Sequence, residues 1–258
     1  MIQTRHDPFR ILGVDFDLLD YPQVIQQIEQ WRKAGRRSFV AVANPYSVSL
    51  CRRDGEMARA VDQSGMTLPD GVGVVMAAKM LGYPNHGRVT GPTLMLRLCD
   101  EGRKHGYRHY FYGGRPGVAA SLAERLTLQF PGLEVAGHYC PPFGQISELQ
   151  DIAIVDQINA ARPDVLWVGL GAPKQEKWML QHVGRIHATA MIGVGAAFDF
   201  HSGNVKWAPS WIRRIGMEWA YRLMLEPGRM WRRNLESPRF LAAVAVQRLT
   251  SRSSRLAQ

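Results

Sequence analysis

Apolar runs of strand length alternate with helical patterns along most of the chain. Residues 38–44, 165–171 and 188–195 are apolar almost throughout, whereas residues 21–35 space their apolar side chains as a helix does and end on a glycine. A strand that is apolar along its whole length is buried on both faces, as in a parallel sheet covered by helices. The pattern therefore predicts an α/β fold with a Rossmann-like parallel sheet flanked by helices.

The same patterns place the remaining elements. Further strands are predicted at 66–71, 109–114 and 133–139, a short strand or hairpin at 11–17, and further helices at 54–62, 72–82, 91–106, 116–130, 147–161 and 173–186. Pro116 falls in the first turn of its helix, where the N–H that proline lacks would have no partner anyway. About one helix of chain separates consecutive strands, as parallel pairing requires.

The alternation of strand and helix stops near Gly203. Beyond it the segments APSW, EPGR and SPRF interrupt short helical pieces, and the pattern indicates no further strand. We therefore divide the chain into an α/β domain over residues 1–203 and a C-terminal helical appendage over residues 204–258.

Charge and tryptophan change the picture of this appendage. Residues 205–258 hold 11 Lys and Arg against 3 Glu, a net charge of +8 out of +10 for the whole chain, and they contain four of its seven tryptophans: Trp207, Trp211, Trp219 and Trp231. Basic residues interleaved with tryptophan suit a surface that is both anionic and apolar, which favours a bilayer over nucleic acid. A helical cover that never touches lipid is the alternative.

The mode of membrane contact and the cellular compartment follow from what the sequence lacks. No stretch of 18 apolar residues is present, so membrane contact is predicted to be peripheral. No zinc finger or RNA-recognition signature accompanies the basic charge, and we predict no nucleic-acid partner. Three cysteines without CxxC spacing (Cys51, Cys99 and Cys140) and an N-terminus without a signal-peptide pattern predict a reducing, cytoplasmic location.

Candidate chemistry lies where predicted strands end, because ligands of parallel sheets gather at the carboxyl ends of the strands. Asn44 ends one strand and can either hydrogen-bond a sugar or cap the next helix. Asp70 is a candidate general base, although an aspartate in a Pro-Asp-Gly turn can also serve only the turn. Arg88 lies in a loop before a helix, where it can neutralise a phosphate or simply lie in solvent.

Two glycine-rich turns, FYGGRPG at 111–117 and GLGAPKQE at 169–176, precede helix starts. Glycines let the backbone approach a phosphate, and the helix start supplies free N–H groups and a positive dipole end. Neither turn matches a dinucleotide or P-loop fingerprint, so a structural role stays open. Two such turns in one sheet favour a diphosphate ligand such as a nucleotide-sugar. His201, beside Asp199 at a predicted strand end, is a weak metal candidate, and we predict no metal site.

The ordered set of motifs resembles the bacterial WecG/TagA/CpsF glycosyltransferases. It comprises VAN, LPDGVGV, RVTG, FYGGRPG, GLGAPKQE, GVGAAFDFHSG and VKWAPSWIRRIGMEWAYRLMLEPGRMWRR, and it extends over residues 11–241. The resemblance implies an inverting, metal-independent and cofactor-free transfer of a sugar from a UDP-sugar to a polyprenyl-diphosphate-linked saccharide. It places the enzyme at the inner face of the cell membrane, in cell-envelope polysaccharide or exopolysaccharide assembly, and it implies that homo-oligomers can form.

The resemblance also implies roles for individual residues. Asp70 matches the catalytic base of the family, and Asn44, Arg88 and Gln175 match residues that face the substrate pocket. Three arginines of the appendage match groups that reach back over the site and neutralise the departing UDP: Arg222, Arg229 and Arg232. Arginine suits that role because its fork binds phosphate oxygens in pairs.

Three positions depart from the family pattern. Val42 stands where the family often has threonine, Trp207 where it usually has arginine, and Thr93 where many members have aspartate. These changes leave the donor open between an N-acetylmannosamine type and glucose. The alternative to an enzyme is a non-catalytic module that binds a nucleotide or a lipid diphosphate and releases no UDP.

Overall fold

The computed structural model describes residues 8–83, 87–144 and 146–256, with the backbone alone for Arg229, Arg232, Arg233 and residues 251–256. The predicted α/β class is confirmed by a six-stranded sheet in which every pairing is parallel. Its strands are β3 (Ser38–Ala43), β4 (Met66–Pro69), β5 (Arg108–Gly113), β6 (Glu134–Tyr139), β7 (Val165–Gly169) and β8 (Ala190–Gly193). They lie side by side in the order β4-β3-β8-β7-β5-β6.

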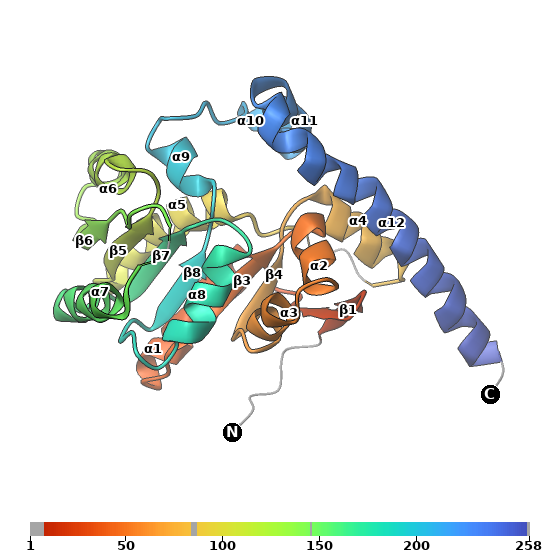
Figure 1. Cartoon of the computed structure of the whole chain (residues 1–258), viewed down its shortest axis with the longest axis horizontal. Coiled ribbons are helices and arrows are strands. Elements are labelled where there is room, and N and C mark those ends of the chain that lie inside the picture. Colours follow the sequence, from red (N-terminus) through yellow and green to blue (C-terminus); the bar gives the residue numbers. More distant parts are fainter. Residues whose placement is uncertain (1–7, 84–86, 145, 257–258) are drawn as a thin grey trace.

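Helices cover both faces of this sheet (Figure 1). One face packs against α1 (Tyr21–Lys33), α5 (Gly91–Gly102) and α6 (Val118–Gln129); the other packs against α7 (Glu148–Ala160) and α8 (Lys174–His182). Neighbouring residues of β7 show the alternation, because Trp167 faces the first set of helices and Leu166 the second. Both faces are therefore apolar, as the uninterrupted apolar runs predict.

A second apolar cluster joins the start of the described chain to its last helix. The antiparallel hairpin of β1 (Phe9–Ile11) and β2 (Val14–Phe16) packs with α2 (Pro45–Cys51), α3 (Gly55–Asp62), α4 (Val72–Met80) and α12 (Pro227–Leu256). Phe240 and Val244 of α12 are fully buried in this cluster. The Gln247 amide adds two hydrogen bonds to the hairpin, accepting one from the Leu12 N–H and donating one to the Arg10 carbonyl.

Three shorter helices complete the chain before α12: α9 (Ala197–His201), α10 (Ser210–Arg214) and α11 (Glu218–Leu225). The segment expected as a strand end beside His201 is therefore helical. The predicted break at SPRF is also wrong, because α12 runs through Pro238. An interior proline costs about 3 kcal/mol, and Met230 and Phe240, buried on either side of it, hold the helix together.

Other predicted boundaries shift by a few residues. Pro116 lies outside α6, since Gly117 caps that helix in a left-handed conformation (φ 84°) that favours glycine. The helix expected to end at residue 186 stops at His182, because Val183 is extended. The one expected to reach residue 106 becomes a single 3₁₀ turn, η1 (Arg103–His105), after α5. None of the described helices is long and apolar enough to cross a membrane.

One core residue makes the sheet sensitive to acid. His109 of β5 is fully buried, and its Nδ1 accepts a hydrogen bond of 3.1 Å from Trp167 Nε1. Burial lowers the pKa of this imidazole to about 3, so the folded protein holds it neutral. The unfolded chain takes up a proton below the ordinary histidine pKa, and the free energy of unfolding therefore decreases as the pH falls from about 6.5 toward 3.

We expect His109→Gln to remove this contribution, because the glutamine oxygen can still accept from Trp167 but does not titrate. Between about pH 6 and pH 4 the wild type should lose up to about 1.4 kcal/mol more per pH unit than the variant. Urea unfolding at several pH values measures the difference. His187→Gln, at an exposed position, is the matched control and should keep the wild-type slope. Identical slopes for wild type and His109→Gln would contradict the assignment.

Candidate active site

A cavity of about 730 Å³ opens at the carboxyl ends of β3, β4, β7 and β8. Residues 215–219 and Arg222, from α11 and the loop before it, line another side of the cavity. The helices α10 and α11 with the loop between them, residues 210–225, are called the lid below, and α12 also contributes lining residues. Five of the residues predicted from sequence line this one cavity: Asn44, Asp70, Arg88, Gln175 and Arg222. The sequence separates the first of these from the last by most of the chain, and the fold brings them together.

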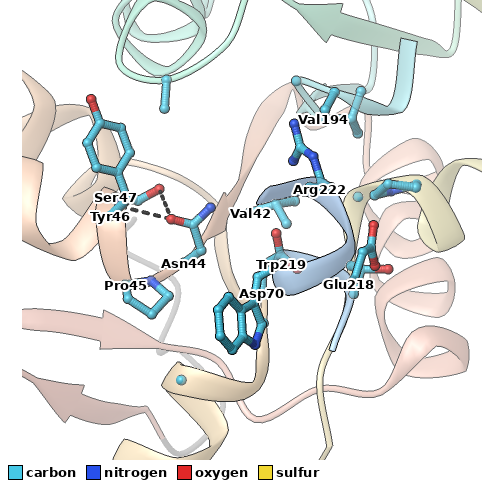
Figure 2. Close-up of a pocket in the computed structure, with 18 of the residues that line it drawn as sticks. Val42, Asn44, Pro45, Tyr46, Ser47, Asp70, Val194, Glu218, Trp219 and Arg222 are labelled. Carbon is cyan, nitrogen blue, oxygen red and sulfur yellow. Dashed lines mark hydrogen bonds between the residues drawn. The ribbon is translucent and has the colours of Figure 1, made fainter. Parts of the chain in front are cut away.

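Asp70 stands at the end of β4. Its backbone N–H donates to the carbonyl of Ala43 at 2.9 Å, which continues the pairing of β4 with β3 by one residue. Gly71 then turns the chain with a φ of 85° and starts α4. The turn fixes the carboxylate at the cavity wall, in the same space as Trp219 and Arg222 (Figure 2).

Asn44 divides its side chain between two tasks. Its Oδ1 accepts hydrogen bonds from the backbone N–H of Ser47 at 3.1 Å and from the Ser47 hydroxyl at 3.4 Å, and it thereby caps α2. The capping alternative is thus confirmed. Figure 2 shows the amide nitrogen directed away from these bonds, on the side of the cavity. The sugar-binding role remains a prediction for that nitrogen.

Gln175 links the two loops that follow β7 and β8. Its Oε1 accepts from the N–H of Gly171 at 3.2 Å and of Gly195 at 3.1 Å, and its Nε2 donates to Glu176 at 3.0 Å. The side chain is buried, and Gly193 leaves room for it, since a Cβ there would lie 2.9 Å from Nε2. Gln175 therefore shapes the cavity floor by positioning backbone groups.

Arg88 is engaged by the lid. Its guanidinium Nη2 donates to the backbone carbonyl of Arg213 in α10. Arg222 of α11 also lines the cavity, with its guanidinium carbon 5.2 Å from the ring centre of Phe200. The side chains of Arg229 and Arg232 lie outside the described residues, so their predicted positions are not tested.

The cavity wall carries charged groups of both signs. Two arginines, Arg88 and Arg222, provide positive charge, and guanidinium groups bind phosphate oxygens. Four acidic residues also line the cavity: Asp70, Glu176, Asp199 and Glu218. Carboxylates accept hydrogen bonds from sugar hydroxyls, and one of them can act as a general base. The wall therefore offers cations for an anionic group and carboxylates for hydroxyl groups.

Sequence reasoning overlooked several residues of this wall. Glu176 lies in the GLGAPKQE motif after β7, and Asp199 lies in the GVGAAFDFHSG motif after β8. Their positions in these motifs could have identified them as candidates. Glu218 and Trp219 belong to the motif over 205–233, but no predicted strand end marks them. Asn234 comes from α12, which packs on α2, α4 and the hairpin through contacts distant in sequence.

His201 has a structural position. Its Nε2 donates to the carbonyl of Pro92 at 2.9 Å, and its ring meets Trp207 edge-to-face at 4.9 Å. Burial lowers the pKa of this imidazole, which favours the neutral form. Within the described ranges no group of three or more His, Cys, Asp or Glu side chains could hold a metal ion.

Comparison with known proteins adds a family and several relatives. The sequence profile of the glycosyl transferase WecG/TagA/CpsF family matches residues 9–254. An N-acetylglucosaminyldiphosphoundecaprenol N-acetyl-β-D-mannosaminyltransferase of Bacillus spizizenii is 36% identical over 207 residues, which cover 80% of this chain and 78% of the relative. Proteins of the same name from Bacillus subtilis and Staphylococcus aureus are 32% identical (80% of this chain, 78% of the relative) and 29% identical (86% and 85%).

We expect Gln175→Ala to lower the free energy of unfolding by about 2–4 kcal/mol, because two backbone N–H groups lose their acceptor. Urea unfolding measures the loss. Gln181→Ala is the control: this exposed amide makes one bond, to Glu56, and its removal should change stability by less than about 0.5 kcal/mol. Equal effects of the two substitutions would show that Gln175 does not hold the loops.

Proposed function

We propose, since this chain belongs to the WecG/TagA/CpsF family of glycosyltransferases, that it moves a sugar from a UDP-sugar to a polyprenyl-diphosphate-linked saccharide, with inversion and without a metal ion. One observation carries the proposal: a single cavity holds a carboxylate at a strand end together with two arginines. The Bacillus and Staphylococcus relatives, which are named for action on an undecaprenyl-diphosphate-linked N-acetylglucosamine, support the acceptor class.

In the proposed reaction Asp70 acts as the general base. Its carboxylate takes the proton of an acceptor hydroxyl while that oxygen attacks the anomeric carbon of the donor. The bond from this carbon to the diphosphate oxygen breaks, and UDP leaves with the electron pair. Attack on the side opposite the leaving group inverts the anomeric centre in a single displacement.

Charge on the departing diphosphate must be stabilised as that bond breaks. Arg88 and Arg222 are the described cations of the cavity wall, and fixed guanidinium groups in a site shielded from water stabilise such charge strongly. We assign Arg229 and Arg232 to the same task, as the family resemblance implies. Asn44 would orient the substrate through its amide nitrogen, and Gln175 through the backbone groups that it holds.

The sugar of the donor is proposed to be of the N-acetylmannosamine type or glucose. Val42, one of the departures from the family pattern, lines the cavity and offers a methyl surface in place of a hydroxyl. Thr93 lies in α5. A panel of UDP-sugars, assayed for UDP release with a polyprenyl-diphosphate monosaccharide, separates these donors. A non-catalytic binding module would release UDP from none of them.

We further propose that the appendage over residues 204–258 docks on the inner face of the cell membrane. Large apolar side chains are exposed along α10–α12, including Trp211 (62%), Ile215 (61%), Met224 (73%) and Trp231 (49%). Basic residues among them add about 1 kcal/mol each near anionic lipid. Docking there would bring the cavity, which the same helices border, to the lipid-linked acceptor.

Substitution of Asp70 tests the catalytic assignment. We expect Asp70→Asn to lower kcat about a hundredfold to ten-thousandfold, because the amide keeps the shape but cannot take a proton. UDP affinity, measured by calorimetry, should change little. Asp156→Asn, an exposed position on α7, is the matched control and should leave turnover unchanged. Wild-type turnover in Asp70→Asn would remove this residue from the reaction.

Paired tryptophan substitutions test membrane docking. Trp211→Ser with Trp231→Ser should reduce partition onto anionic vesicles at least about tenfold, because two exposed apolar side chains are lost from the docking face. Leu128→Ser with Phe143→Ser removes side chains of similar exposure (75% and 80%) outside the appendage, and it should leave partition unchanged. Point substitutions are preferable to truncation, since Phe240 and Val244 belong to the core. Equal partition of both variants would argue against docking through the appendage.

A further inference from the structure

Trp207 lies in the connection between α9 and α10. It contacts both the lid and the part of the chain before residue 204, which is called the body below. On the side of the body its ring stacks with Phe200, at 6.1 Å between centres and 15° between planes, and meets His201 edge-to-face at 4.9 Å. On the side of the lid the guanidinium carbon of Arg213 lies 3.6 Å from the ring centre. The indole Nε1 donates to Glu218 at 3.1 Å.

These contacts continue to the cavity along two short routes. Glu218 itself lines the cavity, so the indole N–H fixes the position of a carboxylate of the wall. The Arg213 side chain packs on the indole, and the backbone carbonyl of Arg213 accepts a hydrogen bond from the Arg88 guanidinium. A hydrogen bond of 2.9 Å from Arg213 Nε to the carbonyl of Ala208 holds that side chain in place.

The body side of the contact is itself fixed. The His201 ring is oriented by its bond to the Pro92 carbonyl, and Phe200 is buried. Phe200 also contacts the lid, since the guanidinium carbon of Arg222 lies 5.2 Å from its ring centre. Trp207 therefore rests on a rigid support, and a tryptophan meets both demands of this place. Its large ring stacks between two layers, and its N–H reaches a carboxylate.

We propose that Trp207 is a positioning residue for sugar transfer, which holds the lid on the body and thereby places Glu218 and Arg88 in the cavity wall. Trp207 does not itself line the cavity in the described structure. The inference rests on the proposed function for its kinetic consequence, whereas its structural consequence can be measured without any substrate.

Two substitutions separate the parts of this contact. Trp207→Ala removes the ring and the N–H, and Trp207→Phe keeps an aromatic ring between Phe200 and Arg213 but cannot donate to Glu218. Phe143→Ala is the control, because this aromatic side chain is 80% exposed and lies outside both the lid and the proposed docking face. Hydrogen exchange of the full-length variants reports opening of the lid, and exchange in α5 reports whether the core stays folded.

In Trp207→Ala we expect amide exchange in residues 210–222 and 87–91 to accelerate together, with α5 unchanged. The dissociation constant of UDP and the KM of the donor should rise about tenfold, because the competent arrangement becomes a minor population, while kcat at saturating donor falls less. Trp207→Phe should recover most of the slow exchange and part of the affinity. Phe143→Ala should match the wild type in the exchange of these segments, in UDP affinity and in the KM of the donor.

Unchanged exchange in the lid of Trp207→Ala would overturn the inference. So would faster exchange with unchanged UDP affinity and KM, since Trp207 would then serve the fold alone. Failure of the wild type to release UDP from every donor would reject the proposed function instead. The exchange of residues 87–91 and 210–222 would still decide whether Trp207 holds the lid and Arg88.

Discussion

The burial of the parallel sheet on both faces determines where chemistry can occur in this protein. Strands β3, β7 and β8 lie between helices along nearly their whole length, where a charged side chain would lose its hydration without compensation. These three strands accordingly carry no charged side chain, and the charged groups of the cavity begin where strands end. Because the strands are parallel, their carboxyl ends share one edge, and this is why Asn44, Asp70 and Gln175 meet at one cavity.

The other half of the cavity comes from the last part of the chain. The lid supplies Glu218 and Arg222, and α12 supports the lid through residues that belong to the core. Arg53, just beyond α2, pairs with the buried Glu236 at 3.3 Å, which adds a polar contact between α12 and the sheet domain. The resulting wall combines arginines with carboxylates.

Short sequence patterns predicted the features that neighbouring residues of the chain determine. Apolar runs revealed the strands of the sheet, and motifs at their ends revealed Asn44, Asp70 and Gln175, which all line the cavity. The continuity of α12 through Pro238 could not be predicted, because it depends on the burial of Phe240 against residues more than two hundred positions earlier. The hydrogen bond from Arg88 to the Arg213 carbonyl could not be predicted either, since it forms only when the lid folds back over the ends of the strands.

The contact of α12 with the β1–β2 hairpin, which includes two hydrogen bonds of Gln247, affects how the chain folds during synthesis. The hairpin is synthesised before the other described elements, yet its apolar side is not fully covered until α12 is made. Phe9 and Phe16 lack their packing contact with Phe240 until most of the chain has been translated. A nascent chain that stops before α12 thus exposes the apolar side of this hairpin, which a chaperone or a protease can recognise. Because α12 also lines the cavity, the cavity is complete only once this helix has been made.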